Sequence, residues 1–422
     1  MTRSFIILVL ALTAAIPGVA ENPNAASEAK SPAERAIAQA QRLIEKNPKD
    51  FGAYNALALA LSRRARETSE VKYYAQAEEA IEKSFSISPD NFDAARTHVW
   101  LLLGKHEFAA ALEEAKTLNK RMPDDVMIYG FLTDADVELG KYSDGEVSAQ
   151  MMLDLRPGNL PGLTRAAYLR ELFGDVDGAL DLMNMALQST SPSEVEDAAW
   201  IVTQMAHLKF SKGNMTDAEH YLHQALTLFP GYHYALGNLA KVRMQQKRYD
   251  EAIDLLRQRY QKAPHAENLF DLAEALQSGG RTAEAQQAFA EFERKSLAET
   301  DRADNSNREL IFYYADYSHE PLKALEVAKR EFGRRRDVFT LDAYAWALHV
   351  NGKDLEARQW IEQALAIGIR DAKLIRHAGK VALAQGDRDA ADNYFRQAED
   401  LASGFLETKA TRSFASSNPA QR

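Results

Sequence analysis

Apolar residues recur every three to four positions along nearly the whole chain, from about Ser31 to Ala402. This period places the apolar side chains on one face of an α-helix. Ser31, Pro32 and Glu34 open the pattern as a serine N-cap, a proline at the first helical position and a capping-box glutamate. The sequence has no β-branched runs with alternating polar and apolar positions, so it predicts an all-α fold.

Prolines divide this helical pattern at nearly equal intervals. Steps of 41, 34, 34, 35, 38 and 34 residues separate Pro48, Pro89, Pro123, Pro157, Pro192, Pro230 and Pro264. Glycines repeat with the same period, since Gly140 and Gly174, like Gly352 and Gly386, are 34 residues apart. A fixed period of this size predicts a stack of similar helix pairs with a long binding surface.

One repeat unit shows what each landmark does. In residues 126–159, Tyr129 and Leu132 are bulky residues of a first helix and Gly140 stands at its end. Ala149 is a small residue of the second helix, and Pro157 follows that helix. Bulky and small residues interlock between helices, the glycine permits a left-handed turn, and the proline cannot continue the second helix.

This arrangement resembles the tetratricopeptide repeat, an antiparallel helix pair of 34 residues. Residues 233–266 and the last unit match the same pattern. In the last unit Gly379 is a small residue that would let two helices approach, and Phe395 is a bulky residue that would fill a gap between helices. The resemblance covers roughly residues 32–402. It implies an all-α, right-handed superhelical solenoid of about ten units, one incomplete at the start and one degenerate around 309–336.

The period is interrupted at three places. Residues 62–76 hold an insertion of about seven residues, residues 188–196 lengthen a connection, and residues 296–308 form a polar break. We therefore divide the solenoid into an N-terminal part at 32–296, a linker at 297–308 and a C-terminal part at 309–402.

The two ends of the chain differ from the repeats. Residues 1–20 contain Arg3, a short apolar stretch and small residues before Ala20, so they predict a secretory signal peptide cleaved after Ala20. An uncleaved membrane anchor is the alternative. Residues 21–31 are predicted to be a flexible spacer, and residues 403–422 a disordered tail.

Composition limits the kinds of partner. The formal net charge is −10 with 51 basic and 61 acidic residues, which gives no basic footprint for nucleic acid. The chain has no cysteine, so disulfides and thiolate chemistry are excluded. No further apolar stretch is long enough to span a membrane, and we expect a mature chain without an integral membrane segment.

Motifs for catalysis are absent from the sequence. It has no phosphate-binding glycine loop, no Gly-x-Ser-x-Gly elbow and no His-Glu-x-x-His pair. We therefore expect a non-catalytic protein without a cofactor. His220 and His223, with Glu219 and the later His233, form one metal-like group, for which exposed surface histidines are the simpler interpretation.

The tetratricopeptide resemblance implies that positions 2, 5, 9 and 12 of each first helix line a concave groove. Aromatic side chains beside a few charges suit an extended peptide or a partner helix. Packing of the aromatic residues between units is the alternative. The candidate partner-binding residues are Trp200, His207, Phe210, Tyr234, Lys241, Met244, Trp346, His349, Lys373, Arg376 and Lys380.

These observations predict an exported protein-interaction scaffold in the periplasm of a Gram-negative-type bacterium. Residues 199–259 and 337–383 resemble a narrower group of exported bacterial tetratricopeptide proteins without assigned activity. One alternative is a component of envelope polysaccharide assembly or export, in which aromatic rings bind glycan or its machinery. A second alternative is a metal-binding protein or enzyme that uses His220 and His223. The sequence leaves the identity of the protein partner and the oligomeric state open.

Overall fold

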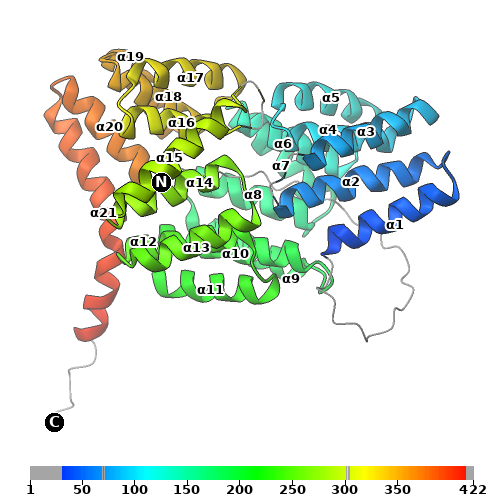
Figure 1. Cartoon of the computed structure of the whole chain (residues 1–422), viewed down its shortest axis with the longest axis horizontal. Helices are drawn as coiled ribbons and strands as arrows, with labels where there is room; N and C mark the ends of the chain where they lie inside the picture. The colour runs from blue at the N-terminus through cyan, green and yellow to red at the C-terminus, as the bar shows by residue number, and fades with distance from the viewer. Residues whose placement is uncertain (1–30, 69, 71, 301, 303–304, 415–422) are drawn as a thin grey trace, which may run out of the picture.

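The computed structural model describes residues 31–414 except 69, 71, 301 and 303–304, and the side chains of the last helix as far as Leu401. Within these residues, 21 α-helices and the short π-helix η1 follow one another without a strand (Figure 1). The predicted signal peptide and most of the predicted spacer lie outside the described residues. None of the described helices combines the length and the apolar character needed to cross a bilayer.

The first helix, α1 (Pro32–Lys46), is followed by ten antiparallel helix pairs, which confirms the predicted solenoid of about ten units. The pairs are α2 (Phe51–Thr68) with α3 (Lys72–Ile87), α4 (Phe92–Gly104) with α5 (Phe108–Arg121), α6 (Val126–Glu138) with α7 (Tyr142–Leu155), α8 (Leu160–Leu172) with α9 (Val176–Ser189), α10 (Val195–Ser211) with α11 (Met215–Leu228), α12 (His233–Gln245) with α13 (Tyr249–Lys262), α14 (Ala266–Ser278) with α15 (Thr282–Leu297), α16 (Asn307–Phe312) and η1 (Tyr313–Tyr317) with α17 (Pro321–Arg334), α18 (Val338–Val350) with α19 (Asp354–Leu365), and α20 (Ala372–Ala384) with α21 (Arg388–Phe414).

Local sequence explains where these helices begin and end. Ser31 and Glu34 form the predicted capping box at the start of α1. Gly140 and Gly174 adopt φ of 74° and 84° in the turns after α6 and α8, as the glycine spacing predicts. A Cβ atom on Gly379 would lie 2.6 Å from the Phe395 ring, so the predicted close approach of α20 and α21 requires glycine.

Two boundaries differ from the prediction. The insertion at 62–76 mostly extends α2, which has 18 residues where α4, α6 and α8 have 13. The last helix continues past residue 402 as far as Phe414, into the segment predicted to be a disordered tail. The predicted linker at 297–308 falls on a connection of the structure, since α15 ends at Leu297 and α16 begins at Asn307.

Each pair has two ends, which we call the turn edge and the loop edge. The turn edge holds the short turn inside the pair, and the loop edge holds the connections to the neighbouring pairs. In Figure 1 the pairs α2–α5 lie on one side of the molecule, α17–α21 lie on the other, and the chain passes between them through α9–α11. Successive superhelical turns touch, because turn edges of early pairs contact loop edges of later pairs at three places.

At the first place, the end of α2 contacts the starts of α10 and α12. The Arg66 guanidinium binds the carboxylates of Glu196 and Asp197, with Nη2 2.9 Å from Asp197 Oδ1. The Tyr232 hydroxyl donates to Glu196 Oε1 at 2.7 Å, and His233 Nε2 lies 3.1 Å from the Arg66 carbonyl oxygen. All five residues lie at or below about a tenth of full exposure, so charges 130 residues apart in sequence are buried together.

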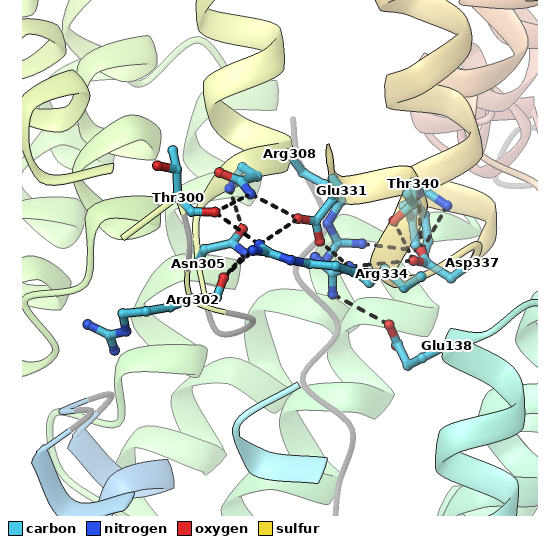
Figure 2. Close-up of polar contacts among 12 residues, drawn as sticks. Glu138, Thr300, Arg302, Asn305, Arg308, Glu331, Arg334, Asp337 and Thr340 are labelled. Carbon is cyan, nitrogen blue, oxygen red and sulfur yellow. Dashed lines mark hydrogen bonds and ion pairs between the residues drawn. The ribbon is translucent and has the colours of Figure 1, made fainter. Parts of the chain in front are cut away.

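At the second place, the turn between α6 and α7 contacts the connection from α17 to α18. Figure 2 shows Glu138 on α6 facing the polar residues of this connection. The Arg336 amide donates to the Glu138 carbonyl oxygen at 2.9 Å, and the Val338 amide donates to the Tyr142 hydroxyl at 2.8 Å. The Arg335 guanidinium lies 3.4 Å from Glu138 Oε2, so an ion pair also crosses this contact.

At the third place, the turn between α8 and α9 contacts the connection from α19 to α20. The Gly368 carbonyl oxygen lies 2.6 Å from where a Cβ of Gly174 would be. Leu169, Leu172, Ile369 and Leu374 belong to one apolar cluster that spans this contact. The superhelix is therefore closed against itself by both polar and apolar contacts.

Candidate functional site

The first helices of neighbouring pairs form the inner face of the superhelix. Contacts join α2 to α4, α4 to α6, α6 to α8, α10 to α12, α16 to α18 and α18 to α20. Helices that pack directly on their counterparts in the next pair lie on the shorter arc of a curved stack. All predicted partner-binding residues lie on four of these helices, namely α10, α12, α18 and α20.

Two of the predicted residues on α10 are buried. Trp200 is 6% exposed and belongs to an apolar cluster formed by helices α8 to α12. His207 is buried as well, and its Nε2 lies 2.8 Å from Glu171 Oε1 on α8. Their surroundings agree with the packing alternative, since each fills a gap between neighbouring units.

The other four predicted residues on α10 and α12 are half-buried. Phe210 and Tyr234 pack against the same cluster as Trp200, and Met244 packs against the cluster of the following units. Burial raises the pKa of Tyr234 well above its usual value. Lys241, also on α12, is half-buried. Partner binding at these four residues stays a prediction.

The second predicted group lies on α18 and α20, around Trp346. This side chain is 5% exposed, and its Nε1 donates to Asp316 Oδ1 of η1 at 2.9 Å. Its ring stacks on His377 with centroids 4.2 Å apart, and His377 Nδ1 lies 2.7 Å from Asp342 Oδ1. Trp346 is thus the fixed centre of a contact that joins three successive first helices.

Lys373, Arg376 and Lys380 surround this centre, and we call these three residues the α20 cationic row. They follow one face of α20 at spacings of three and four residues. Lys380 Nζ lies 4.7 Å from the centroid of the Trp346 ring, and Lys373 Nζ lies 3.5 Å from the centroid of Phe312. Arg376 and Lys380 are exposed, and Lys373 is half-buried.

No carboxylate pairs with any member of the α20 cationic row in the part of the chain that the structure describes. Lys380 and Lys373 nevertheless lie against aromatic rings, which attract cations and hold them in place. The nearby His349, also a predicted residue, has its Nδ1 2.5 Å from Asp354 Oδ1 and is engaged within its own pair. This arrangement leaves three positive charges available to an outside anion.

The histidines proposed as an alternative metal group are not brought together. His220 and His223 are exposed on α11, where His223 Nε2 lies 3.6 Å from Glu219 Oε1. His233 is 2% exposed and lies in the contact with α2. Among the described residues, no group of three or more histidine, aspartate or glutamate side chains is arranged so that it could hold a metal ion.

Sequence reasoning missed the residues that join the superhelical turns. Burial raises the pKa of Glu138 to about 8, and Asp337 adds to the rise while Arg335 opposes it. Arg308 and Arg335 act in the opposite direction on Asp337, so the pKa of that carboxyl is lowered despite its burial. Glu331, bound by Arg335 Nε at 2.7 Å, also has a lowered pKa.

The interruptions of the period were the available signal for these residues. The insertion at 62–76 carries Arg66, and the lengthened connection at 188–196 ends at its partner Glu196. The polar break at 296–308 ends at Arg308, which contacts Asp337 at 3.2 Å. Two of the three departures from the repeat, at 62–76 and 188–196, therefore meet in the contact between α2 and α10.

Comparison with known families agrees with this geometry. Residues 209–264 match the tetratricopeptide repeat model. No curated protein matches the sequence. The matched segment runs from the end of α10 through α13, and the helix pairs on both sides of it repeat the same architecture.

Two solved structures have a similar fold at low sequence identity. The Cut9–Hcn1 hetero-tetramer of the APC/C aligns with a TM-score of 0.51 and 15% identity over 86% of this chain and 58% of the other. The human IFIT1 dimer with m7Gppp-AAAA aligns with a TM-score of 0.51 and 15% identity over 87% of this chain and 86% of the other. The chain thus spans less than two thirds of the first of these structures. At this identity the likeness concerns the fold alone.

Proposed function

We propose that this protein is a non-catalytic scaffold of the bacterial periplasm that binds an acidic segment of a partner protein. The binding surface is the inner face of α16, α18 and α20. The observation that carries the proposal is the α20 cationic row, whose three charges have no carboxylate partner among the described residues. Unpaired cations beside aromatic rings attract carboxylates and steer their approach.

The spread of the charges favours a peptide over a free ion. Lys373, Arg376 and Lys380 extend over two turns of α20, and the aromatic rings beside Lys380 and Lys373, those of Trp346 and Phe312, are buried. An extended acidic peptide presents carboxylates along its length and can reach all three charges. Residues 1–20 support export, because a charged start, a short apolar stretch and a small-residue exit are typical of secretory signals.

A charge-reversal experiment tests the proposal. The probe is a fluorescein-labelled, glutamate-rich peptide, and its binding to residues 21–422 is measured by fluorescence anisotropy at low and high salt. We expect Lys373→Glu/Arg376→Glu/Lys380→Glu to weaken binding at least about tenfold, because the attraction becomes a repulsion. A lysine-rich peptide should not bind the wild type.

The matched control carries the same change of charge elsewhere. Lys49→Glu/Lys83→Glu/Lys120→Glu alters three exposed lysines on other parts of the surface and should leave the affinity within about twofold. Equal losses in the two variants would show that only net charge matters. Absence of binding to the wild type would contradict an acidic partner at this face.

A further inference from the structure

The contacts between superhelical turns leave two edges of the molecule uncovered. The early pairs offer their turn edges to the loop edges of later pairs, as at Arg66, Gly140 and Gly174. The loop edges of the early pairs and the turn edges of the late pairs therefore face outward. We call them the free loop edge and the free turn edge.

Exposed apolar side chains gather on these two edges. Among the described residues, ten large hydrophobic side chains are exposed, and six of them lie there. The free turn edge carries Leu322, Leu355 and Leu383, at 78%, 80% and 51% exposure. The free loop edge carries Phe51, Met122 and Leu155, at 43%, 44% and 39% exposure.

Two equivalent positions are buried in the contact between α6–α7 and α17–α18. Val137 and Leu383 are both the next-to-last residue of a first helix, yet Val137, in the contact with α18, is only 2% exposed. Val338 and Phe51 are both the first residue of a first helix, and Val338 is 0% exposed in that contact. The free edges thus present the kind of side chain that the internal contacts bury.

Two leucines of the free turn edge stand where three other pairs have polar residues. Leu322 and Leu355 are the second residues of α17 and α19. The same position holds Ser143 in α7, Asp177 in α9 and Thr216 in α11. A polar residue is therefore compatible with this position, and the helix pair itself does not require leucine.

From these placements we propose that the free turn edge of one copy of this chain binds the free loop edge of a second copy. Inside the molecule, turn edges bind loop edges, so a second copy supplies the matching partner for each free edge. The contact uses different surfaces on the two copies, and such a contact forms rings or open chains of molecules. It buries leucine, phenylalanine and methionine side chains that are otherwise in water.

Sedimentation velocity and light scattering on residues 21–422, over a range of concentrations, test this proposal. We expect the mean mass of the wild type to rise with concentration. Leu322→Glu/Leu355→Glu blocks the turn edge, and Met122→Glu/Leu155→Glu blocks the loop edge. Each variant should be monomeric alone, with association weakened at least about tenfold by a buried charge.

Mixing the two variants distinguishes this contact from a symmetric one. Each variant keeps one intact edge, so an equimolar mixture should form a one-to-one complex and nothing larger. Val147→Glu, at an exposed position of α7 away from both edges, should associate as the wild type does. Circular dichroism and urea midpoints verify that all variants are folded.

Two results would overturn the proposal. One is a wild type that stays monomeric up to about 100 μM. At that concentration, association with a binding free energy of about 5 kcal/mol or more would be detected. The other is a mixture of the two variants that stays monomeric while the wild type associates. None of these variants changes a residue of the α20 cationic row, so either result leaves the proposed function unaffected.

Discussion

Glu138 shows how burial sets the ionisation of a single residue in this protein. Its carboxyl group is 3% exposed and lies 3.4 Å from the Arg335 guanidinium, which also binds Glu331. Burial penalises the charged form more than Arg335 favours it, so the pKa rises from 4.5 to about 8. Near neutral pH the folded protein therefore binds a proton at Glu138 that the unfolded chain has released.

This raised pKa predicts a pH-dependent stability. Because the folded state binds the extra proton, the contribution of Glu138 to stability is fully present below about pH 4.5 and is lost as the pH rises through about 8. Glu138→Gln removes the titration. We expect the free energy of unfolding of the variant, relative to wild type, to increase by at least about 1 kcal/mol between pH 5 and pH 8.5.

Urea unfolding at several pH values measures this difference. Glu219→Gln is the control, because Arg243 lowers the pKa of Glu219 to about 2 and its contribution is lost only as the pH falls. Between pH 5 and pH 8.5 the free energy of unfolding of Glu219→Gln should change with pH as that of the wild type does. If the free energy of unfolding of Glu138→Gln also follows the wild type, the Glu138 carboxyl is ionised throughout this range.

At the scale of the helix pair, the turn after the first helix has two roles. Every pair needs a turn, and Gly174 and Gly352 serve it with φ of 84° and 71°. At Gly352 a Cβ would meet nothing within 4 Å, whereas at Gly174 it would lie 2.6 Å from the Gly368 carbonyl oxygen. Gly174 thus ends a helix and also lets two superhelical turns approach.

Comparing the two glycines separates these roles. Gly352→Ala should cost about 1–2 kcal/mol, the penalty of a left-handed conformation for a residue with a Cβ. Gly174→Ala should cost clearly more, since it also forces α8–α9 away from the connection between α19 and α20. Urea unfolding gives the loss of unfolding free energy for both variants. Equal losses would mean that the contact between Gly174 and Gly368 adjusts to the extra Cβ at no free-energy cost.

The helix pairs were predictable because their determinants are local. The capping box at Ser31, the left-handed glycines at 140 and 174, and the close helix approach at Gly379 all follow from local residue types. The contacts between turns were not predictable in this way. Arg66 and Glu196 are 130 residues apart, and which units meet depends on the accumulated rotation of all the pairs between them.

The candidate site was predictable in its position and less so in its exposure. The repeat pattern placed Trp346 and Lys380 on the same inner face. In the structure Lys380 Nζ lies 4.7 Å from the centroid of the Trp346 ring. It could not tell that Trp346 would be covered by His377 and bound to Asp316, because those contacts come from two neighbouring units. Among the predicted residues, Arg376 and Lys380 of the α20 cationic row are exposed.

At the scale of the whole molecule, the contacts between turns change how the solenoid unfolds. An open repeat array is stabilised only by neighbouring units, so its ends open first. Here Arg66 ties α2 to α10, and Arg335 ties α17–α18 to α6. Distant units therefore support one another.

Arg66→Leu tests this coupling. The change leaves Glu196 and Asp197 buried without their cation and should destabilise the protein by about 3–5 kcal/mol. We also expect amide hydrogen exchange in α2–α5 to become faster than in α10–α15, because the first turn loses its attachment. The exposed pair of Arg121 and Asp90 provides the control, and Arg121→Leu should cost less than about 1 kcal/mol. Uniform acceleration along the chain would argue against a loosened first turn.

The contact between α2 and α10 also restricts how this chain can change over generations. Open repeat proteins gain and lose units readily, because each added unit only meets its neighbours. Here the gain or loss of one unit between Arg66 and Glu196 would move the two side chains apart along the superhelix axis. Duplication or deletion of a repeat in this interval would break a buried ion pair, so we expect descendants of this chain to vary in their surface residues and to keep the number of these units.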